Sequence, residues 1–149
     1  MIRMTRDSET GAPSIDSAGP LAVVAAAIVQ EGRLLVVSKQ AAPTVFYLPG
    51  GKPDADEAPL ETLVRELDEE LGVEPLEPRF LADVEAMAAL ERTPMRLSVF
   101  EARIGQVPEP AAELSALRWI SGQERDVRLA PAVRDHVLPL LRQRGALAS

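Results

Sequence analysis

The chain has 149 residues, a formal net charge of −7 and no cysteine, which excludes disulfides, cysteine-bound zinc and a thiol nucleophile. The acidic balance argues against nucleic acid as a partner, because neutralising its phosphates needs a basic surface, whereas a bound metal still allows small phosphorylated ligands. No apolar run is long enough to span a membrane and the N-terminus lacks the apolar segment of a signal peptide, so we expect a cytoplasmic protein with no membrane partner.

The sequence changes character near residue 20. The first 20 residues are rich in Ser, Gly, Pro, Asp and Thr, so we expect residues 1–20 to form a flexible tail. Beyond them nearly half of the residues are apolar, and the length suits one folded unit. We therefore expect residues 21–149 to form a single domain.

Two kinds of periodicity alternate along this domain. Strands are predicted at residues 21–30, 33–38, 45–48, 80–86, 96–104 and 116–120. A helix is predicted from Pro59 to Gly72, because apolar residues recur there at intervals of three and four. A last helix is expected to begin near Pro131, to bury Leu140 and to be kinked by Pro139. Strands on both sides of a central helix predict a mixed-sheet α/β sandwich.

The predicted central helix carries three carboxylates, Glu66, Glu69 and Glu70, on one face. At 100° per residue this face lies beside the apolar stripe that anchors the helix. Like charges at this spacing repel by about a few tenths of a kcal/mol each in solvent, and by more when partly buried. A divalent cation such as Mg²⁺, or Mn²⁺, would relieve that repulsion. A solvated acidic face is the alternative interpretation.

The glycine pair before the helix favours a binding site. Gly50 and Gly51 allow a ligand to approach the backbone at a distance that a side chain would block. A loop that doubles back from them would bring Glu57 to the end of the acidic helix. The glycine pair therefore shifts the balance toward a metal-binding face, with the solvated face still the alternative.

The stretch from Gly51 to Val73 resembles the Nudix box of Nudix hydrolases at every specified position. The box has Gly, five residues, Glu, seven residues, and then Arg-Glu-apolar-any-Glu-Glu-any-Gly-apolar. The matching residues are Gly51, Glu57, Arg65, Glu66, Leu67, Glu69, Glu70, Gly72 and Val73. The preceding Phe46–Gly50 is similar to the family's lead-in. The resemblance covers residues 46–73 by identity and 20–145 by architecture, and it implies a Nudix-type α/β/α sandwich with a mixed central β-sheet.

The resemblance also implies roles for particular residues. Metal ligands would be the Gly50 carbonyl and the side chains of Glu66, Glu69 and Glu70. Glu57 and Arg65 would brace the loop and helix, and the catalytic set would be Glu57, Arg65, Glu66, Glu69 and Glu70. Substrate would be held by Gly51, Lys52 and Phe46, although Lys52 equally suits an exposed loop position. Tyr47 is the alternative to Phe46 for stacking on a base, and packing in the core is the favoured interpretation for both. Glu113 is the first candidate for a downstream metal-binding carboxylate, before Glu85 and Glu91, and a plain surface charge is the alternative for each.

By resemblance, the reaction is hydrolysis of a phosphoanhydride in a nucleoside diphosphate linked to another group. Markers for ADP-ribose or dinucleotide substrates, a proline or a tyrosine, are missing from the expected window, Ala88 to Glu91. This favours the compact mutator-type group, which converts nucleoside triphosphates, including oxidised ones, to monophosphate and pyrophosphate. The alternatives are an ADP-ribose or nucleotide-sugar pyrophosphatase and a nucleotide-binding module without catalysis. The partner would be a small nucleotide, and a homodimer is compatible with the family.

Overall fold

The computed structural model describes residues 20–148, so the expected flexible tail, residues 1–20, lies almost wholly outside the described residues. The strands are β1 (Leu21–Gln30), β2 (Arg33–Lys39), β3 (Ala42–Tyr47), β4 (Gly50–Gly51), β5 (Pro75–Met87), β6 (Pro94–Ile104), β7 (Leu114–Ile120) and β8 (Arg128–Leu129). The helices are α1 (Pro59–Leu71) and α2 (Leu138–Gln143), the latter preceded by a π-helical turn (Val133–Val137). No helix in residues 20–148 is long and apolar enough to cross a membrane.

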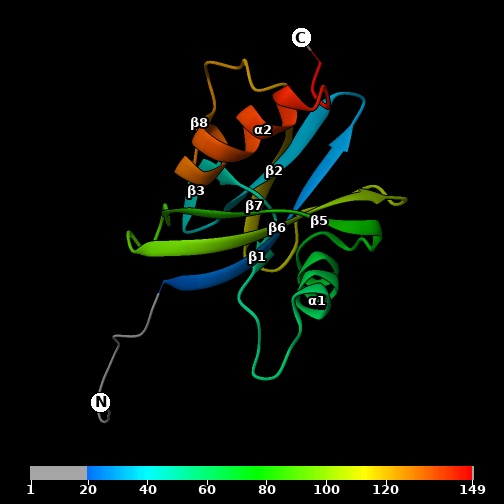
Figure 1. Ribbon diagram of the computed structural model, residues 1–149, viewed down its shortest axis with the longest axis vertical. Coiled ribbons are helices and arrows are strands. Elements are labelled where there is room, and N and C mark those ends of the chain that lie inside the picture. Colours follow the sequence, from blue (N-terminus) through cyan, green and yellow to red (C-terminus); the bar gives the residue numbers. More distant parts are fainter. Residues whose placement is uncertain (1–19, 149) are drawn as a thin grey trace.

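The strands form one mixed sheet with a helix on each side (Figure 1). The main order is β5-β6-β1-β2-β3-β8, while β4 pairs with β1 and β7 with β2. Strand β1 runs parallel to β6 and antiparallel to β2 and β4. The α/β/α sandwich with a mixed central sheet that was expected from the sequence is confirmed.

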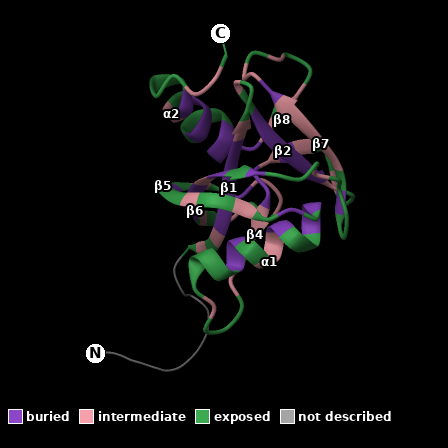
Figure 2. Cartoon of the chain, turned by 90° about the vertical axis from the view of Figure 1, so that its right-hand side faces the viewer, coloured by how far each residue is buried: buried purple, intermediate pink, exposed green. Residues whose placement is uncertain are grey.

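The strand β1 separates two apolar cores because its residues are buried on both faces. Val24, Ala26 and Ile28 pack in the core that includes α1. Ala25 and Ala27 pack in the core that includes the π-helical turn and α2. Figure 2 shows the buried face of α1 turned toward the sheet and its exposed face toward solvent.

The helix α1 has the bounds that its sequence predicts. Pro59 stands in the first turn, where its missing N–H breaks no bond, and Gly72 ends the helix with a left-handed φ of 68°. Leu63, Leu67 and Leu71 are each at most 1% exposed. The acidic face of the helix is therefore held in place by the burial of its leucine face.

The C-terminal helix differs from its prediction. It begins at Pro131, but residues 133–137 form a π-helical turn in which the Leu138 N–H donates to the Val133 carbonyl. Pro139 has no N–H to continue the α-helical ladder, and the extra residue of the π turn rotates the apolar face. Leu138 is consequently buried, and Leu140, which was expected in the core, is half-exposed.

Candidate active site

The glycine pair of β4 brings the backbone against both β1 and α1. A Cβ atom at Gly50 would lie 2.1 Å from the Val24 carbonyl oxygen, and one at Gly51 would lie 2.3 Å from Oε2 of Glu66. The Gly50 N–H donates a hydrogen bond of 3.2 Å to Oε1 of Glu70. Glycine is therefore required at position 50 for the sheet, whereas at position 51 a Cβ atom would displace the end of the Glu66 side chain.

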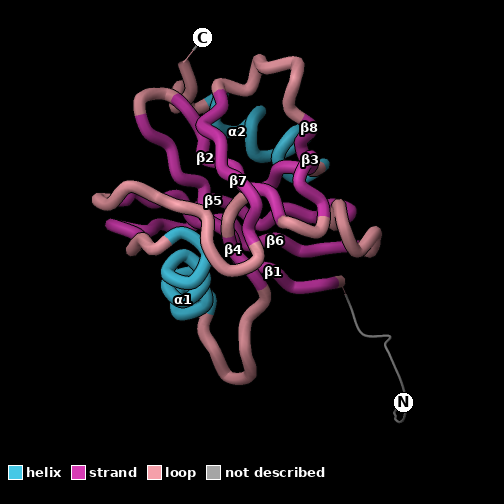
Figure 3. Tube along the Cα trace, turned by 180° about the vertical axis from the view of Figure 1, so that it is seen from behind, coloured by secondary structure: helices cyan, strands magenta, loops and turns pink. Residues whose placement is uncertain are grey.

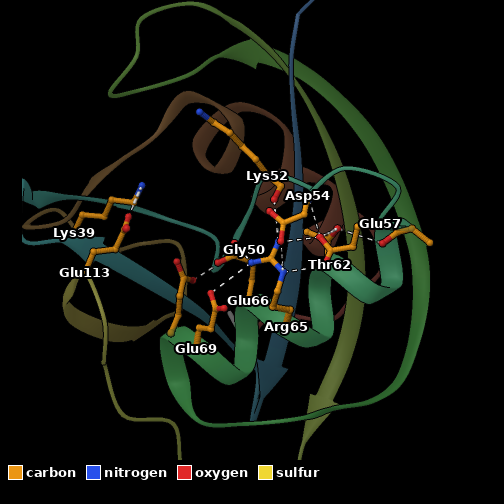
Figure 4. Close-up of polar contacts among 12 residues, drawn as sticks. Lys39, Gly50, Lys52, Asp54, Glu57, Thr62, Arg65, Glu66, Glu69 and Glu113 are labelled. Atoms are coloured by element: carbon orange, nitrogen blue, oxygen red, sulfur yellow. Dashed lines mark hydrogen bonds and ion pairs between the residues drawn. The ribbon is translucent and has the colours of Figure 1, made fainter.

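Arg65 makes polar contacts with both the loop before α1 and the helix itself (Figure 4). Its Nε and Nη2 donate to the two carboxylate oxygens of Glu57 at 2.8 and 2.9 Å. Its Nη1 donates to Oε2 of Glu66 at 3.0 Å, and its Nη2 also donates to the Lys52 carbonyl at 3.1 Å. One guanidinium thus joins the loop to an acidic residue of the helix.

Glu57 fastens the other end of the loop. Besides Arg65, its Oε1 accepts hydrogen bonds from the Asp54 N–H at 2.9 Å and from the hydroxyl of the fully buried Thr62 at 2.8 Å. The hydrogen bonds from Arg65 lower the pKa of Glu57 to about 2. The loop that joins β4 to α1 extends away from the sheet as a wide turn (Figure 3). The contacts of Glu57 with Asp54, Thr62 and Arg65 fix the point where this loop returns to the helix.

The three carboxylates of the acidic face have different surroundings. Glu70 is only 5% exposed, and its burial, reinforced by the charge of Glu66, raises its pKa to about 7. Burial also raises the pKa of Glu66, against the lowering effect of Arg65. The side chain of Glu69 is 54% exposed. Negative charge is therefore concentrated where solvent is least able to stabilise it.

These carboxylates line one pocket of about 390 Å³ whose lining is partly charged and partly apolar. We call the charged part the charged end: Lys39, Lys52, Glu66, Glu69, Glu70, Glu91 and Glu113, with Gly50 and Gly51. We call the apolar part the apolar end: Leu21, Val23, Leu48, Ala88, Ala89, Leu90, Met95, Leu97, Ala112, Ala130, Ala132 and Val133. Several of the apolar residues belong to the core on the α2 side of the sheet, whereas Glu66, Glu69 and Glu70 stand on α1. Tyr47 is the one uncharged polar side chain among the described lining residues. The volume and the two ends suit a small molecule with an anionic and an apolar part.

The structure brings most of the predicted site residues together. Gly50, Gly51, Lys52, Glu66, Glu69, Glu70 and Glu113 line the pocket. Glu57 and Arg65 are not part of the lining: Arg65 donates to Glu66 and to the Lys52 carbonyl, and Glu57 accepts from Arg65. Of the two alternatives to Glu113, Glu91 lines the pocket, and Glu85 instead pairs with Arg96 at 2.9 Å.

Phe46 requires a correction. It was expected to contact substrate, but it is 8% exposed and packs in the core on the α2 side of the sheet. Its neighbour Tyr47 lines the pocket instead, because successive side chains of a strand point to opposite faces. The Tyr47 hydroxyl is buried and has no hydrogen-bond partner among the described residues.

Sequence reasoning missed Lys39, Thr62 and the whole apolar end of the pocket. Thr62 could have been found from its position on the α1 face that meets Glu57. The apolar end had no local signal, because it is assembled from β1, β6, the loop between β5 and β6, and the segment before the π-helical turn.

The donor chemistry of the charged end fits a hard divalent cation. Glu66, Glu69 and Glu70 offer carboxylate oxygens beside the backbone of Gly50, and such cations prefer oxygen ligands. Within residues 20–148 no three acidic or histidine side chains already have their ligating atoms gathered around one point. Glu66 instead accepts from Arg65, and Glu70 from the Gly50 amide. The raised pKa of Glu70 shows that these contacts leave its charge poorly compensated.

Comparison with known proteins places the chain in a family. The family model for the NUDIX domain matches residues 19–141. The MutT NUDIX hydrolase from Burkholderia pseudomallei is 27% identical with a TM-score of 0.70, over 85% of this chain and 98% of that one. The E. coli ORF135 protein is 29% identical with a TM-score of 0.65, over 90% of this chain and 94% of that one. The NUDIX domain of Shewanella oneidensis NrtR, solved with ADP ribose, is 22% identical with a TM-score of 0.69, over 85% of this chain and 89% of that one. No curated protein matches significantly.

The fold and the acidic loop-helix segment define an enzyme that hydrolyses acid anhydrides of phosphorus. Because the domain match spans most of its length, the chain belongs to the Nudix hydrolase family, and it has the compact fold of the MutT type. Nudix hydrolases generally use divalent metal cations, in agreement with the donor chemistry of the charged end.

Proposed function

We propose that the protein hydrolyses nucleoside triphosphates, oxidised ones included, to the monophosphate and pyrophosphate, with Mg²⁺ as cofactor and Mn²⁺ as a substitute. The observation that carries the proposal is the two-ended pocket of about 390 Å³, in which the acidic face of α1 meets an apolar wall. The charged end would take the phosphates and the apolar end the base. Cytoplasmic location remains the expectation from composition, and a homodimer remains an option that sedimentation would test.

Metal binding, side-chain positioning and phosphate binding would fall to different residues in and around the Nudix box. Glu66, Glu69, Glu70 and the Gly50 carbonyl would hold the cation, and Glu113 is a further candidate ligand on the same pocket. The cation, when bound, supplies neutralisation of phosphate oxygens and activation of water. Arg65 keeps Glu66 oriented, and Glu57 keeps Arg65 in place. Lys52 and the Gly51 backbone would contact the phosphates, while water attacks phosphorus and the anhydride oxygen leaves with the departing phosphate group.

The choice of a triphosphate rests on two observations. The loop from Ala88 to Glu91, where ADP-ribose and dinucleotide hydrolases of the family carry a proline or a tyrosine, lines the pocket and has neither. The Burkholderia neighbour, which matches over nearly its whole length, is described as a MutT hydrolase. The first disfavours ADP-ribose and dinucleotide substrates, and the second favours the mutator-type activity.

The alternative substrates are ADP-ribose and nucleotide sugars. One neighbour of similar fold binds ADP ribose, and another is a UDP-X diphosphatase. A binding module without catalysis is a third hypothesis. It is less favoured because the chain keeps Glu66, Glu69 and Glu70, which a module would not need.

A nucleotide panel with Mg²⁺ tests the proposal. Each nucleoside triphosphate, its 8-oxo form where one exists, ADP-ribose and UDP-glucose would be supplied, and pyrophosphate and monophosphate products measured. We expect pyrophosphate release from triphosphates, with kcat/KM at least tenfold above that for ADP-ribose and UDP-glucose. Faster cleavage of ADP-ribose or UDP-glucose would instead identify the protein as a pyrophosphatase of that substrate. Tight binding of one nucleotide without turnover of any would identify a nucleotide-binding module without catalysis.

A further inference from the structure

Lys39 lies at the charged end of the pocket, although it belongs to β2 and stands outside the Nudix box. Its Nζ is 3.0 Å from Oε1 of Glu113 and 6.0 Å from the centre of the Tyr47 ring. Figure 4 shows the Lys39 and Glu113 side chains directed toward each other, across from Glu66 and Glu69. Lys39 is thus a cation on the wall that faces the acidic helix.

The strand pairing around Lys39 is irregular on both sides. The pairing of β2 with β7 shifts register between Ser38 and Lys39, the pairing of β2 with β3 shifts between Val37 and Lys39, and the extra residues lie in β7 and β3. Such irregularities are frequent next to active sites. The alternation of β2 itself is kept: Leu35 and Val37 pack on the α1 side of the sheet, and Lys39 follows them on that side and lines the pocket.

A plain surface ion pair is the simpler interpretation of Lys39 and Glu113. Their side chains are 30% and 64% exposed, and exposed pairs contribute little to stability. That interpretation does not account for the charge around the pair. Among the described lining residues only Lys39 and Lys52 are cationic, against Glu66, Glu69, Glu70, Glu91 and Glu113. A cation on the wall opposite the metal ligands would attract a polyphosphate that enters this acidic end.

We propose that Lys39 binds the phosphate chain of the substrate, exchanging its Glu113 partner for a phosphate oxygen when substrate enters. This inference rests on the proposed function. A lysine ammonium is a compact charge with three donors on a flexible stem, which suits transfer from one anion to another. The ion pair with Glu113 then holds Lys39 near its binding position in the free enzyme. Lys39 would contribute to binding of the phosphates and not to activation of water.

The test compares Lys39→Met, Lys39→Arg and Arg33→Met. Arg33 is an exposed cation at the opposite end of the same strand and does not line the pocket, so its variant controls for loss of one positive charge. The readouts are kcat and KM for the triphosphate that the wild type cleaves fastest, the inhibition constant of inorganic pyrophosphate, and the Tm. All are measured at one fixed, saturating Mg²⁺ concentration.

Loss of a hydrogen bond to a charged group predicts that KM and the pyrophosphate inhibition constant rise about 10- to 100-fold in Lys39→Met. We expect kcat to stay within about fivefold, Lys39→Arg to recover most of the loss, and Arg33→Met to match the wild type. The proposal is overturned if Lys39→Met, with a wild-type Tm, changes both constants less than threefold, or if kcat falls while KM is unchanged. If Lys39→Met fails to fold, a Lys39→Gln variant decides by the same thresholds, and Lys39→Arg is still expected to stay close to the wild type. Absence of wild-type turnover on every nucleotide would instead reject the proposed function.

Discussion

Arg65 and Glu57, eight residues apart, are joined by two parallel hydrogen bonds of 2.8 and 2.9 Å. Planar two-point pairing of this kind restricts both side chains and orients the remaining nitrogen of the guanidinium. That nitrogen, Nη1, reaches Glu66 at 3.0 Å. The geometry of a pocket carboxylate therefore depends on a residue that does not itself line the pocket.

The pairing of Glu57 with Arg65 predicts a pH-dependent contribution to stability. The folded pKa of Glu57, about 2, is below its ordinary value of 4.5, so the contribution is complete above about pH 4.5 and is lost as the pH falls toward 2. We expect Glu57→Gln to unfold a few degrees below the wild type at pH 7, with the two Tm curves converging toward pH 2. Glu74→Gln, at an exposed position, is the control. A constant difference between the curves down to pH 2 would contradict the assignment.

Replacement by alanine is predicted to act differently at the two glycines of β4: it should lower stability at Gly50 and activity at Gly51. Gly50→Ala would drive a Cβ atom into the Val24 backbone, so we expect a loss of about 2–3 kcal/mol in the free energy of unfolding. Gly51→Ala would meet only the end of the Glu66 side chain, which can rotate away. Its stability should be nearly unchanged while kcat/KM falls at least about tenfold. Urea denaturation and steady-state kinetics distinguish the pair, and equal losses of stability would refute the distinction.

Removal of a single box carboxylate should abolish most activity without unfolding the protein. In Glu69→Gln and Glu70→Gln, we expect kcat to fall at least about 100-fold, because each amide removes charge from the proposed cation site. Burial disfavours the charged form of Glu70, so metal-free Glu70→Gln should be at least as stable as the wild type at pH 8. Circular dichroism checks the fold, and Mg²⁺ titration of Tm checks binding. Wild-type turnover in either variant would exclude the metal assignment.

The apolar end of the pocket predicts weak discrimination among bases. The side chains of the apolar end have no hydrogen-bonding groups, and Tyr47 is the one uncharged polar side chain beside them among the described lining residues. Apolar contact alone discriminates between similar ligands by a factor of about 100 in kcat/KM at most. We therefore expect kcat/KM for the four common deoxynucleoside triphosphates to lie within about 100-fold of one another. A kcat/KM more than about 1,000-fold higher for one base, measured in competition, would contradict this prediction and would show that polar groups hydrogen-bond to the base.

Local patterns in the chain were sufficient to predict most of its regular elements. The helix α1 follows from leucine spacing, Pro59 and Gly72, and β1 follows from an uninterrupted apolar run. The two-residue strands β4 and β8 were missed because segments so short have no periodicity. The burial of Leu138 in place of Leu140 was missed because the π-helical turn changes the phase of the helix.

The sequence by itself determined the α/β class, the family and the acidic helix, because these depend on residues close together along one segment, from Gly51 to Val73. Only the tertiary structure decided that Tyr47 and not Phe46 faces the pocket, that Lys39 stands opposite the carboxylates, and that an apolar wall completes the site. The physical reason is that a strand's face and its neighbours are set by pairing with distant segments, and register shifts such as the one before Lys39 leave no local pattern.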